Sequence, residues 1–289
     1  MRNIDLESLQ IFKAVVDFGG ITKAADQLHR VQSNITTRVQ NLEERLGVKL
    51  FQRQNGRLVL SSEGRVLLGY AERLLRLSSE AESALRSGVP RGTLRIGSME
   101  STAAAHLPLI LSDYHQNYPE VQIELITGTS GALISKVHRF DIEAAFVAEP
   151  FSPEGLESQE AFIEELVLIT SQSKTAIKSP KNLKKSTVIA FGTGCTYRRV
   201  LEDWLSNFGV IPDCIMEMGS YHAIVACVAA GSGIAIIPRS VLSVVQIGRK
   251  VTTVALPTRF SRVKTCLVWR KGHESMALNA MREGLNQKK

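Results

Sequence analysis

Residues 21–47, ITKAADQLHRVQSNITTRVQNLEERLG, contain two amphipathic patterns separated by a short polar break. In the first pattern the apolar residues recur at helical spacing, and they are Ala24, Ala25 and Leu28. In the second pattern they repeat at intervals of three and four, as Ile35, Val39, Leu42 and Leu46. The stretch therefore predicts two helices joined by a tight turn, and the small alanines allow these helices to cross closely.

The second predicted helix leaves one face free of apolar residues. The first half of that face carries short or planar hydrogen-bonding side chains, which are Gln32, Ser33, Asn34, Thr36, Thr37 and Arg38. Such groups suit base edges and phosphates when they lie in the N-terminal half of a recognition helix. A surface hairpin of any kind also shows a polar face opposite its apolar stripe, so the neighbouring sequence has to decide between the two interpretations.

The flanking segments favour a DNA-binding unit. An amphipathic helix precedes the pair, with Leu6, Leu9, Phe12, Val15 and Val16 on its apolar side. The segment LFQRQNGRLVLSSEG follows and alternates like a small hairpin, with the turn signal Asn55-Gly56 in its middle. Arg53 and Arg57 flank that turn, where they would contact phosphate or a narrow minor groove. Residues 29–41 contain no acidic side chain, whereas an ordinary solvated face usually mixes both signs.

Four blocks of the chain, in this order, resemble the LysR-type transcriptional regulators: LESLQIFKAVVDFGGITKAADQLH, ITTRVQNLEERLGVKLFQR, LVLSSEG and VAAGSGIAIIP. The resemblance implies a winged helix-turn-helix DNA-binding domain over residues 1–60. One departure concerns the start of the recognition helix, where Val31 replaces the small hydroxyl cap usual in the family and Ser33 replaces a frequent proline. Valine cannot cap a helix, so either Ser33 caps a slightly shortened helix or the free backbone amides face DNA phosphate.

A long helix is predicted next, because residues 62–86 contain no proline and carry an apolar side, with Ser61 placed as the cap. A helix of that length spans roughly 37 Å, which is more than a small winged domain covers. The family resemblance implies that residues 61–88 form a dimerisation helix that pairs with its copy; the alternative is a helix lying on the chain's own core. Two-fold pairing predicts an interrupted inverted repeat as the DNA target.

Two glycines and a proline within SGVPRG, residues 87–92, end this pattern, and short β-rich runs then alternate with helical stretches. The predicted strands are LRIGSM, VQIELITG, IEAAFV, EELVLITS, TVIAF, CIMEM, GIAIIP, VTTVAL and KTCLVWR. This alternation is typical of an α/β fold with parallel sheets. The resemblance implies two Rossmann-like subdomains, similar to periplasmic binding proteins, over residues 93–289. Subdomain I is placed at 93–163 and 268–289 and subdomain II at 164–267, with chain crossings near Glu164 and Lys264.

Polar residues at predicted helix starts outline a ligand site in the cleft between such subdomains. The candidates are Glu100, Ser101, Thr102, Thr129 and Ser130 on one side and Cys195, Thr196, Tyr197, Arg198, Ser220 and Tyr221 on the other. Free amides at these starts favour an anion. Arg198 could clamp a carboxylate, or it could be a surface charge beside Glu202 and Asp203. If Glu100 faces the cleft, it would match an ammonium group, and the expected effector is a carboxylate or an amino-acid-like metabolite.

The composition agrees with a DNA-binding regulator. The chain has 289 residues, 44% of them hydrophobic and 6% aromatic, and its 35 basic and 28 acidic residues give a net charge of +7, which favours polyanions. No apolar run reaches the length of a membrane span, and we expect a cytoplasmic protein without membrane contact. The four cysteines are scattered without Cys-x-x-Cys spacing, so buried thiols are expected and zinc or disulfides are not.

The six histidines are dispersed and no catalytic motif accompanies them, so no catalytic residue, metal or cofactor is predicted. The predicted protein is a non-enzymatic, sequence-specific transcription regulator that assembles as a dimer of dimers, a homotetramer. Its small-molecule effector would reorient the lobes, change the bending of the double-stranded DNA and alter contact with RNA polymerase. The alternative is a small-molecule binding protein or degenerate enzyme whose N-terminal domain mediates protein contacts.

Overall fold

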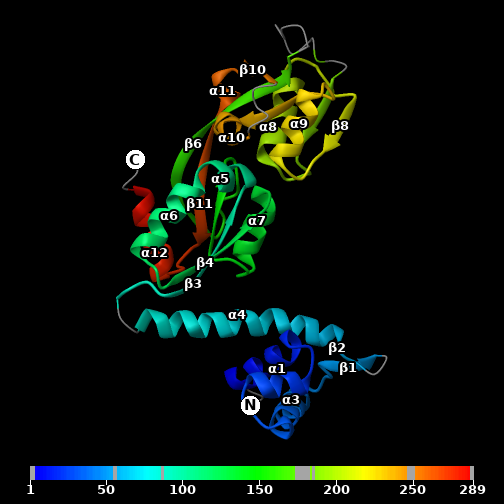
Figure 1. The fold of residues 1–289 in the computed structure, drawn as a ribbon, viewed down its shortest axis with the longest axis vertical. Coiled ribbons are helices and arrows are strands. Elements are labelled where there is room, and N and C mark those ends of the chain that lie inside the picture. Colours follow the sequence, from blue (N-terminus) through cyan, green and yellow to red (C-terminus); the bar gives the residue numbers. More distant parts are fainter. Residues whose placement is uncertain are drawn as a thin grey trace. The chain divides into compact units, whose positions relative to one another are not determined.

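The computed structural model describes residues 4–54, 57–85, 88–172, 183, 186–245 and 251–286. The chain divides into two compact units, Met1–Gly88 and Val89–Lys289, and Figure 1 labels their elements in chain order. Among the described residues, no helix is both long enough and apolar enough to cross a membrane.

The first unit is a three-helix domain with a two-stranded wing and a long final helix. Its elements are α1 (Leu6–Asp17), α2 (Ile21–Gln27), α3 (Gln32–Leu46), β1 (Phe51–Gln54), β2 (Arg57–Leu60) and α4 (Ser62–Leu85). Strands β1 and β2 pair antiparallel. Ala24, Ala25 and Ile35 are buried together between the helices. The predicted helices and hairpin are confirmed, while the predicted turn at Asn55-Gly56 lies outside the described residues.

Helix α4 packs its first turns against the rest of the unit. Leu67 and Ala71 join Leu9, Phe12 and Leu42 in a second buried cluster. The predicted cap is present, since the amide of Gly64 donates to Ser61 Oγ at 2.8 Å. A Cβ atom at Gly64 would lie 2.2 Å from the Leu50 carbonyl oxygen, so only glycine allows this close approach of the helix to the wing.

The second unit is built on a seven-stranded mixed sheet in the order β10-β6-β11-β5-β3-β4, with β9 added to β6. The strands are β3 (Gly92–Ser98), β4 (Val121–Thr127), β5 (Ala144–Ala148), β6 (Leu156–Ser171), β9 (Ala235–Pro238), β10 (Val251–Ala255) and β11 (Arg262–Arg270). A separate parallel pair consists of β7 (Thr187–Ala190) and β8 (Cys214–Glu217). The helices are α5 (Glu100–Ala105), α6 (Leu107–Asn117), α7 (Ser130–His138), α8 (Thr196–Ser206), α9 (Tyr221–Ala229), α10 (Arg239–Val244), α11 (Thr258–Ser261) and α12 (Met276–Asn286).

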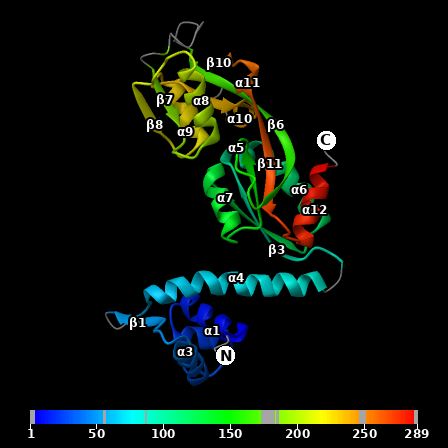
Figure 2. The same cartoon turned by 180° about the vertical axis from the view of Figure 1, so that it is seen from behind.

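Long strands β6 and β11 run between two lobes of this unit (Figures 1 and 2). Lobe I contains β3–β5 and helices α5–α7 and α12, and lobe II contains β7–β10 and helices α8–α11. In lobe I, α6 and α12 cover one face of the sheet and α7 covers the other. Lobe II has its own core, to which Tyr197, Trp204 and Tyr221 belong. Each lobe is therefore packed around its own apolar centre while the sheet continues through both.

Two features differ from the sequence-based prediction. The sheet is mixed, because β6, β9, β10 and β11 pair antiparallel, and only the β3–β4, β3–β5 and β7–β8 pairs are parallel. Strand β6 extends over 16 residues, eight more than predicted, because it forms part of both lobes. The predicted turn in VAAGSGIAIIP is confirmed: α9 ends at Ala229, Gly231 has φ +89°, and a Cβ at Gly233 would lie 2.4 Å from the Thr187 carbonyl oxygen.

Candidate functional site

Helix α3 begins at Gln32, with Val31 at the N-cap position and no side chain accepting a hydrogen bond there. The Val31 side chain is 73% exposed. A Ser33 cap on a shortened helix is therefore not what the structure contains, and the Asn34 amide donates to the Val31 carbonyl at 2.9 Å. Amides that precede it at such an uncapped helix start are suited to an external acceptor such as a phosphate oxygen.

The polar face of α3 is open to solvent. Gln32, Ser33, Asn34 and Thr37 are exposed, and Thr36 and Arg38 are half-buried. Four of the predicted residues, Ser33, Asn34, Thr37 and Arg38, line one surface concavity. The Thr36 hydroxyl donates to the Gln32 carbonyl at 3.0 Å, which leaves it less available for an external contact than the hydroxyl of Thr37. Arg53 and Arg57 are exposed on the wing strands.

Glu7 of α1 pairs with two arginines of this region. Arg30 Nη1 lies 2.7 Å from one carboxylate oxygen, and Arg38 Nη2 lies 3.2 Å from the other. The hydrogen bond from Arg30, together with the charge of Arg38, holds the pKa of Glu7 below its usual range. Because each of the three side chains is 38–41% exposed to solvent, this pairing adds little stability, but it restrains both guanidinium groups beside the helix.

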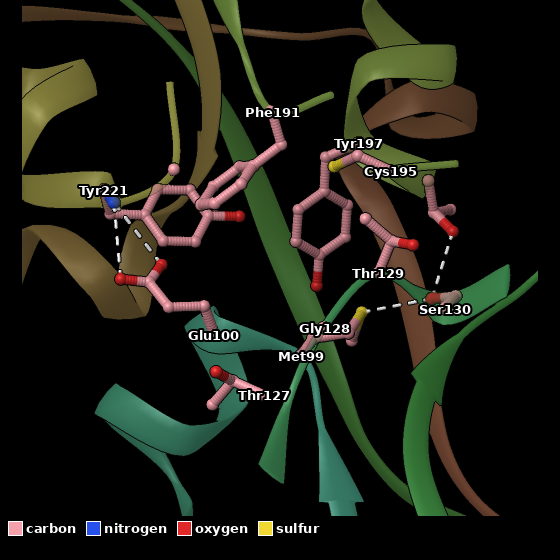
Figure 3. A pocket seen from close by; sticks show the side chains of 12 residues that line it. Met99, Glu100, Thr127, Gly128, Thr129, Ser130, Phe191, Cys195, Tyr197 and Tyr221 are labelled. Atoms are coloured by element: carbon pink, nitrogen blue, oxygen red, sulfur yellow. Dashed lines mark hydrogen bonds between the residues drawn. The ribbon is translucent and has the colours of Figure 1, made fainter. Parts of the chain in front are cut away.

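A cavity of 210 Å³ lies between the lobes of the second unit, and Figure 3 shows its walls. Lobe I contributes Met99, Glu100, Thr127, Gly128, Thr129 and Ser130, and lobe II contributes Phe191, Cys195, Thr196, Tyr197, Gly219 and Tyr221. The aromatic rings of Phe191 and Tyr221 meet edge to face at 4.8 Å. Ends of strands β3, β4 and β7 and starts of helices α7, α8 and α9 thus converge on one space.

Glu100 is the only charged side chain among the described residues that line this cavity. The Tyr221 amide, at the start of α9, donates to both carboxylate oxygens at 3.3 and 3.4 Å, so this contact bridges the two lobes (Figure 3). Burial raises the pKa of Glu100, and the Tyr221 amide offsets only part of this effect. The carboxylate is therefore under-compensated and would gain from a cationic partner.

A second bridge between the lobes lies at the start of α7. The Thr196 hydroxyl donates to Ser130 Oγ at 3.3 Å, and the Ala148 amide donates to the same oxygen at 3.2 Å. The neighbouring Thr129 hydroxyl caps α7 by accepting from the Ala132 amide. Polar groups of this wall are hydroxyls and amides, which can accept or donate without carrying charge.

Desolvation is the largest influence on the pKa values of the titratable groups of lobe II that face the cavity. Burial raises the pKa of the Cys195 thiol, although the Tyr197 and Arg198 amides oppose it. Burial likewise raises the pKa of the phenols of Tyr197 and Tyr221. The cavity is therefore lined by neutral groups apart from Glu100, and the Cys195 thiol lacks the thiolate character of a reactive cysteine.

Comparison with known proteins connects both sites to one family. Residues 6–65 match the model for bacterial regulatory helix-turn-helix proteins of the lysR family, and residues 87–288 match the LysR substrate binding domain. The chain belongs to the LysR family. Two Bacillus subtilis (strain 168) regulators of this family resemble it over most of their length. The protein named uncharacterized HTH-type transcriptional regulator YusT is 40% identical over 280 residues, which cover 95% of this chain and 92% of YusT. GltR is 36% identical, with 93% and 91% covered.

The fold of this LysR-type regulator also matches solved structures. Full-length CbnR in complex with its target DNA is 23% identical to this chain and superposes with a TM-score of 0.71. The match covers 99% of this chain and 100% of CbnR. The two family models and the relatives above 30% identity identify the chain as a DNA-binding transcriptional regulator with an effector-binding domain.

The structure brings together some of the effector-site residues predicted for this LysR-type chain and separates others. Glu100, Thr129, Ser130, Cys195, Tyr197 and Tyr221 line the cavity. Ser101 and Thr102 are fully buried next to Glu100, and Ser220 caps α9 by accepting from the Ala223 amide. Arg198 does not line the cavity. Its guanidinium pairs with Glu202 at 2.8 Å and with Glu217, and it donates to the Phe191 carbonyl. With its side chain 15% exposed, Arg198 is a largely buried member of this ion-pair cluster, and neither the predicted clamp nor a surface charge describes it.

Sequence reasoning missed several lining residues, namely Met99, Thr127, Gly128, Phe191 and Gly219. Met99 and Phe191 end predicted strands, and their apolar side chains suggested core positions only. The rule that ligands bind at the carboxyl ends of strands in such folds could have identified both.

Proposed function

We propose that this LysR-type regulator binds an interrupted inverted repeat through its winged domain and that an amino-acid-like effector in the 210 Å³ cavity controls this binding. The observation that carries the effector proposal is the Glu100 carboxylate, which lies in the cavity with a raised pKa and accepts from a single amide, that of Tyr221, among the described residues. An effector ammonium would supply the missing positive charge. The protein would act on DNA in the cytoplasm without catalysing a reaction, and its relatives YusT and GltR are named transcriptional regulators.

We assign one function to each of three successive segments of the chain. Residues 1–60 bind DNA, 61–88 dimerise, and 93–289 bind the effector. Gln32 and Thr37 are the best candidates for base contacts, because both are exposed near the start of α3. Ser33, Asn34, Thr36 and Arg38 would support them, and Arg53 and Arg57 would contact phosphate from the wing.

Within the cavity, the effector's ammonium would lie at Glu100, and its carboxylate would lie across the cavity near the starts of α7 and α8. Amides at helix starts and the hydroxyls of Thr129 and Ser130 favour an anion there without a cationic side chain. The size fits a small molecule, since the 210 Å³ cavity is many times larger than the roughly 10–15 Å³ that one water molecule needs.

Helix α4 supports the proposed dimer. Val66, Tyr70, Leu74 and Leu77 recur every three or four residues, and each is at least 43% exposed. They lie on the face of the helix next to the buried Leu67 and Ala71, so an apolar stripe stays open after the helix has packed on its own unit. A second copy of α4 is the natural cover for it, and two such dimers would form the proposed tetramer. Lobe movement would then change the spacing of winged domains, DNA bending and contact with RNA polymerase.

The DNA proposal is tested by genome-wide footprinting of the bound protein, followed by mobility shifts on the recovered site. We expect one interrupted inverted repeat and an affinity that falls steeply with salt. Thr37→Ala or Gln32→Ala should cost about 1–3 kcal/mol at one base position. Binding that persists after deletion of residues 1–60 would contradict the proposal.

The effector proposal is tested by calorimetric titration of the full chain with a panel of amino acids and the corresponding organic acids and amines. We expect binding only where ammonium and carboxylate are both present, and a loss of at least about tenfold in Glu100→Gln. Equal affinity for an organic acid that lacks the ammonium would contradict it.

A further inference from the structure

One carboxylate joins two arginines near the start of α3. Arg30 directly precedes the N-cap residue of the helix, and Arg38 lies in its first half. Residues 29–41 contain no acidic side chain, but the fold brings Glu7 of α1 to both arginines. One oxygen of its carboxylate lies 2.7 Å from Arg30 Nη1, and the other lies 3.2 Å from Arg38 Nη2. The two guanidinium groups are therefore close enough to share a single anion.

The fold does not need this contact to hold α1 against α3. Ile11 of α1 and Ile35 of α3 are buried in the same apolar cluster, which already joins the two helices. The three charged side chains are 38–41% exposed, and ion pairs with that exposure add little stability. Both cations therefore remain open to exchange of the carboxylate for another anion.

Arg45, further along α3, is bound differently. Its guanidinium pairs with Asp5 at 2.7 Å and donates to Ser8 Oγ at 2.8 Å, and the amide of Ser8 donates to Asp5 in the N-terminal cap of α1. A ligand that took Arg45 would disturb that cap. A ligand that took Arg30 and Arg38 would instead release one partly exposed carboxylate to water.

A DNA phosphate is the anion that this arrangement suits. Like a carboxylate, a phosphodiester presents two oxygens that share one negative charge, and guanidinium groups bind both kinds of anion through paired N–H donors. The start of α3, which no side chain caps, follows Arg30 in the chain and also favours an anion. Arg38 lines the same concavity as Ser33, Asn34 and Thr37, which are proposed to contact DNA.

We propose that Arg30 and Arg38 form one phosphate-binding site of the winged domain, which Glu7 occupies in the free protein and leaves when DNA binds. The inference rests on the proposed contact of α3 with DNA, and it adds Arg30 to the residues that bind DNA and Glu7 as a residue that opposes binding. Every duplex has to displace the carboxylate, so Glu7 lowers the affinity for DNA of any sequence. Because phosphate contacts carry no sequence information, base contacts from α3 have to supply the affinity that Glu7 removes.

The test titrates the full chain with a random-sequence DNA duplex of fixed length at several salt concentrations. Arg30→Gln should weaken binding and reduce the magnitude of the salt slope by about one, because one phosphate contact is lost. Glu7→Gln should bind at least about threefold more tightly than the wild type, since both guanidinium groups are then free before DNA arrives. Its melting temperature should stay close to that of the wild type, because the ion pairs that it removes are partly exposed.

Loss of any acidic group near DNA strengthens binding to some extent, so a matched control is needed. Glu44 of α3 is exposed and lines the same concavity as Arg38, and Glu44→Gln makes the same change of charge. Each substitution is made in the wild type and in the double variant Arg30→Gln/Arg38→Gln. The gain from Glu7→Gln should fall toward one in the double variant, because no guanidinium is left to release, whereas the gain from Glu44→Gln should be nearly the same in both backgrounds.

The outcomes separate this inference from the proposed function. A gain from Glu7→Gln that is absent, or that persists unchanged without the two arginines, would overturn the competition. Wild-type affinity in Arg30→Gln would overturn the phosphate site, and a markedly lower melting temperature for Glu7→Gln would make the pairing structural and overturn the proposal as well. In these cases Gln32→Ala and Thr37→Ala could still alter base recognition, so the proposed function would stand. Failure of the wild type to bind any duplex would overturn the proposed DNA contacts and this inference together.

Discussion

The polar face of α3 and the interlobe cavity differ in how exposed and how charged their polar groups are. On α3 most of the polar groups are exposed, and the nearby cations Arg30 and Arg38 both pair with the half-buried Glu7. In the cavity the polar groups are buried, and the single charge, Glu100, has a raised pKa.

This difference follows from what each surface has to bind. A phosphate backbone attracts exposed cations over long distances, and the attraction is screened by salt. A small molecule has to be taken out of water, so desolvation and paired hydrogen bonds decide its affinity. We therefore expect DNA binding to depend strongly on ionic strength, and effector binding to depend on pH and on single atoms of the ligand.

The largest expected effect is a loss of stability in the first unit that leaves effector binding by the second unit intact. Gly64→Ala places a Cβ atom 2.2 Å from the Leu50 carbonyl oxygen and should destabilise the first unit by about 3 kcal/mol, with loss of DNA binding. Effector binding should persist, because the cavity belongs to the other unit. Thermal melting, mobility shifts and calorimetry measure the three quantities.

Gly69→Ala is the control for this variant. It lies on the same helix with no atom within 4 Å of its Cβ position, so it should stabilise the helix by roughly 0.5–1 kcal/mol. Similar melting temperatures for the two variants would refute the close-approach argument.

The next effect concerns pH. Burial raises the pKa of Glu100 above the usual 4.5, so the carboxylate that would pair with an ammonium is lost as the pH falls through that raised value. Affinity for an amino-acid effector should therefore be constant from neutral pH down to that pKa and decline by about tenfold per pH unit below it. Calorimetry over a pH series measures it. Glu100→Gln should bind weakly without this dependence, and a wild-type affinity that rises on acidification would contradict the role of the carboxylate.

A smaller effect concerns salt. Arg57→Ala removes one proposed phosphate contact, so the slope of log affinity against log salt should decrease in magnitude by about one. The loss of affinity should be similar for all DNA sequences, which titrations against specific and random duplexes can determine. Effector affinity should change little over the same salt range. A loss restricted to the specific site would instead make Arg57 a base-reading residue.

The smallest effect is at the start of α1. The Ser8 amide donates to Asp5 at 2.7 Å, and this hydrogen bond, aided by Arg45, lowers the pKa of Asp5 to about 2. Asp5→Ala should cost about 1 kcal/mol of unfolding free energy near neutral pH. The wild type should keep this contribution above about pH 4 and lose it as the pH falls toward 2, because the lowered pKa favours the ionised folded state. Urea unfolding of both proteins at several pH values would show no difference if the cap were unimportant.

The sequence predicted the first unit well because its signals are local. Ile35 and Val39 mark the buried side of α3 by spacing alone, and Ser61 precedes the helix that it caps. The cavity depends on contacts between distant segments, which spacing cannot supply. Arg198 was expected to face the ligand, but Glu217 of β8, nineteen residues further along the chain, pairs with it. The first half of β6 was missed because its residues alternate weakly between buried and exposed positions.

The most direct test of the account is the response of DNA binding to an effector in the wild type and in Glu100→Gln. Both proteins should bind the operator with the same affinity and salt dependence when no effector is present, since Glu100 lies in the second unit. An amino acid that binds the wild type should change its footprint or affinity on the operator, and it should leave Glu100→Gln unaffected at the same concentration. A Glu100→Gln protein that responds like the wild type, or a wild type whose footprint stays unchanged when the cavity is occupied, would contradict effector control through this cavity.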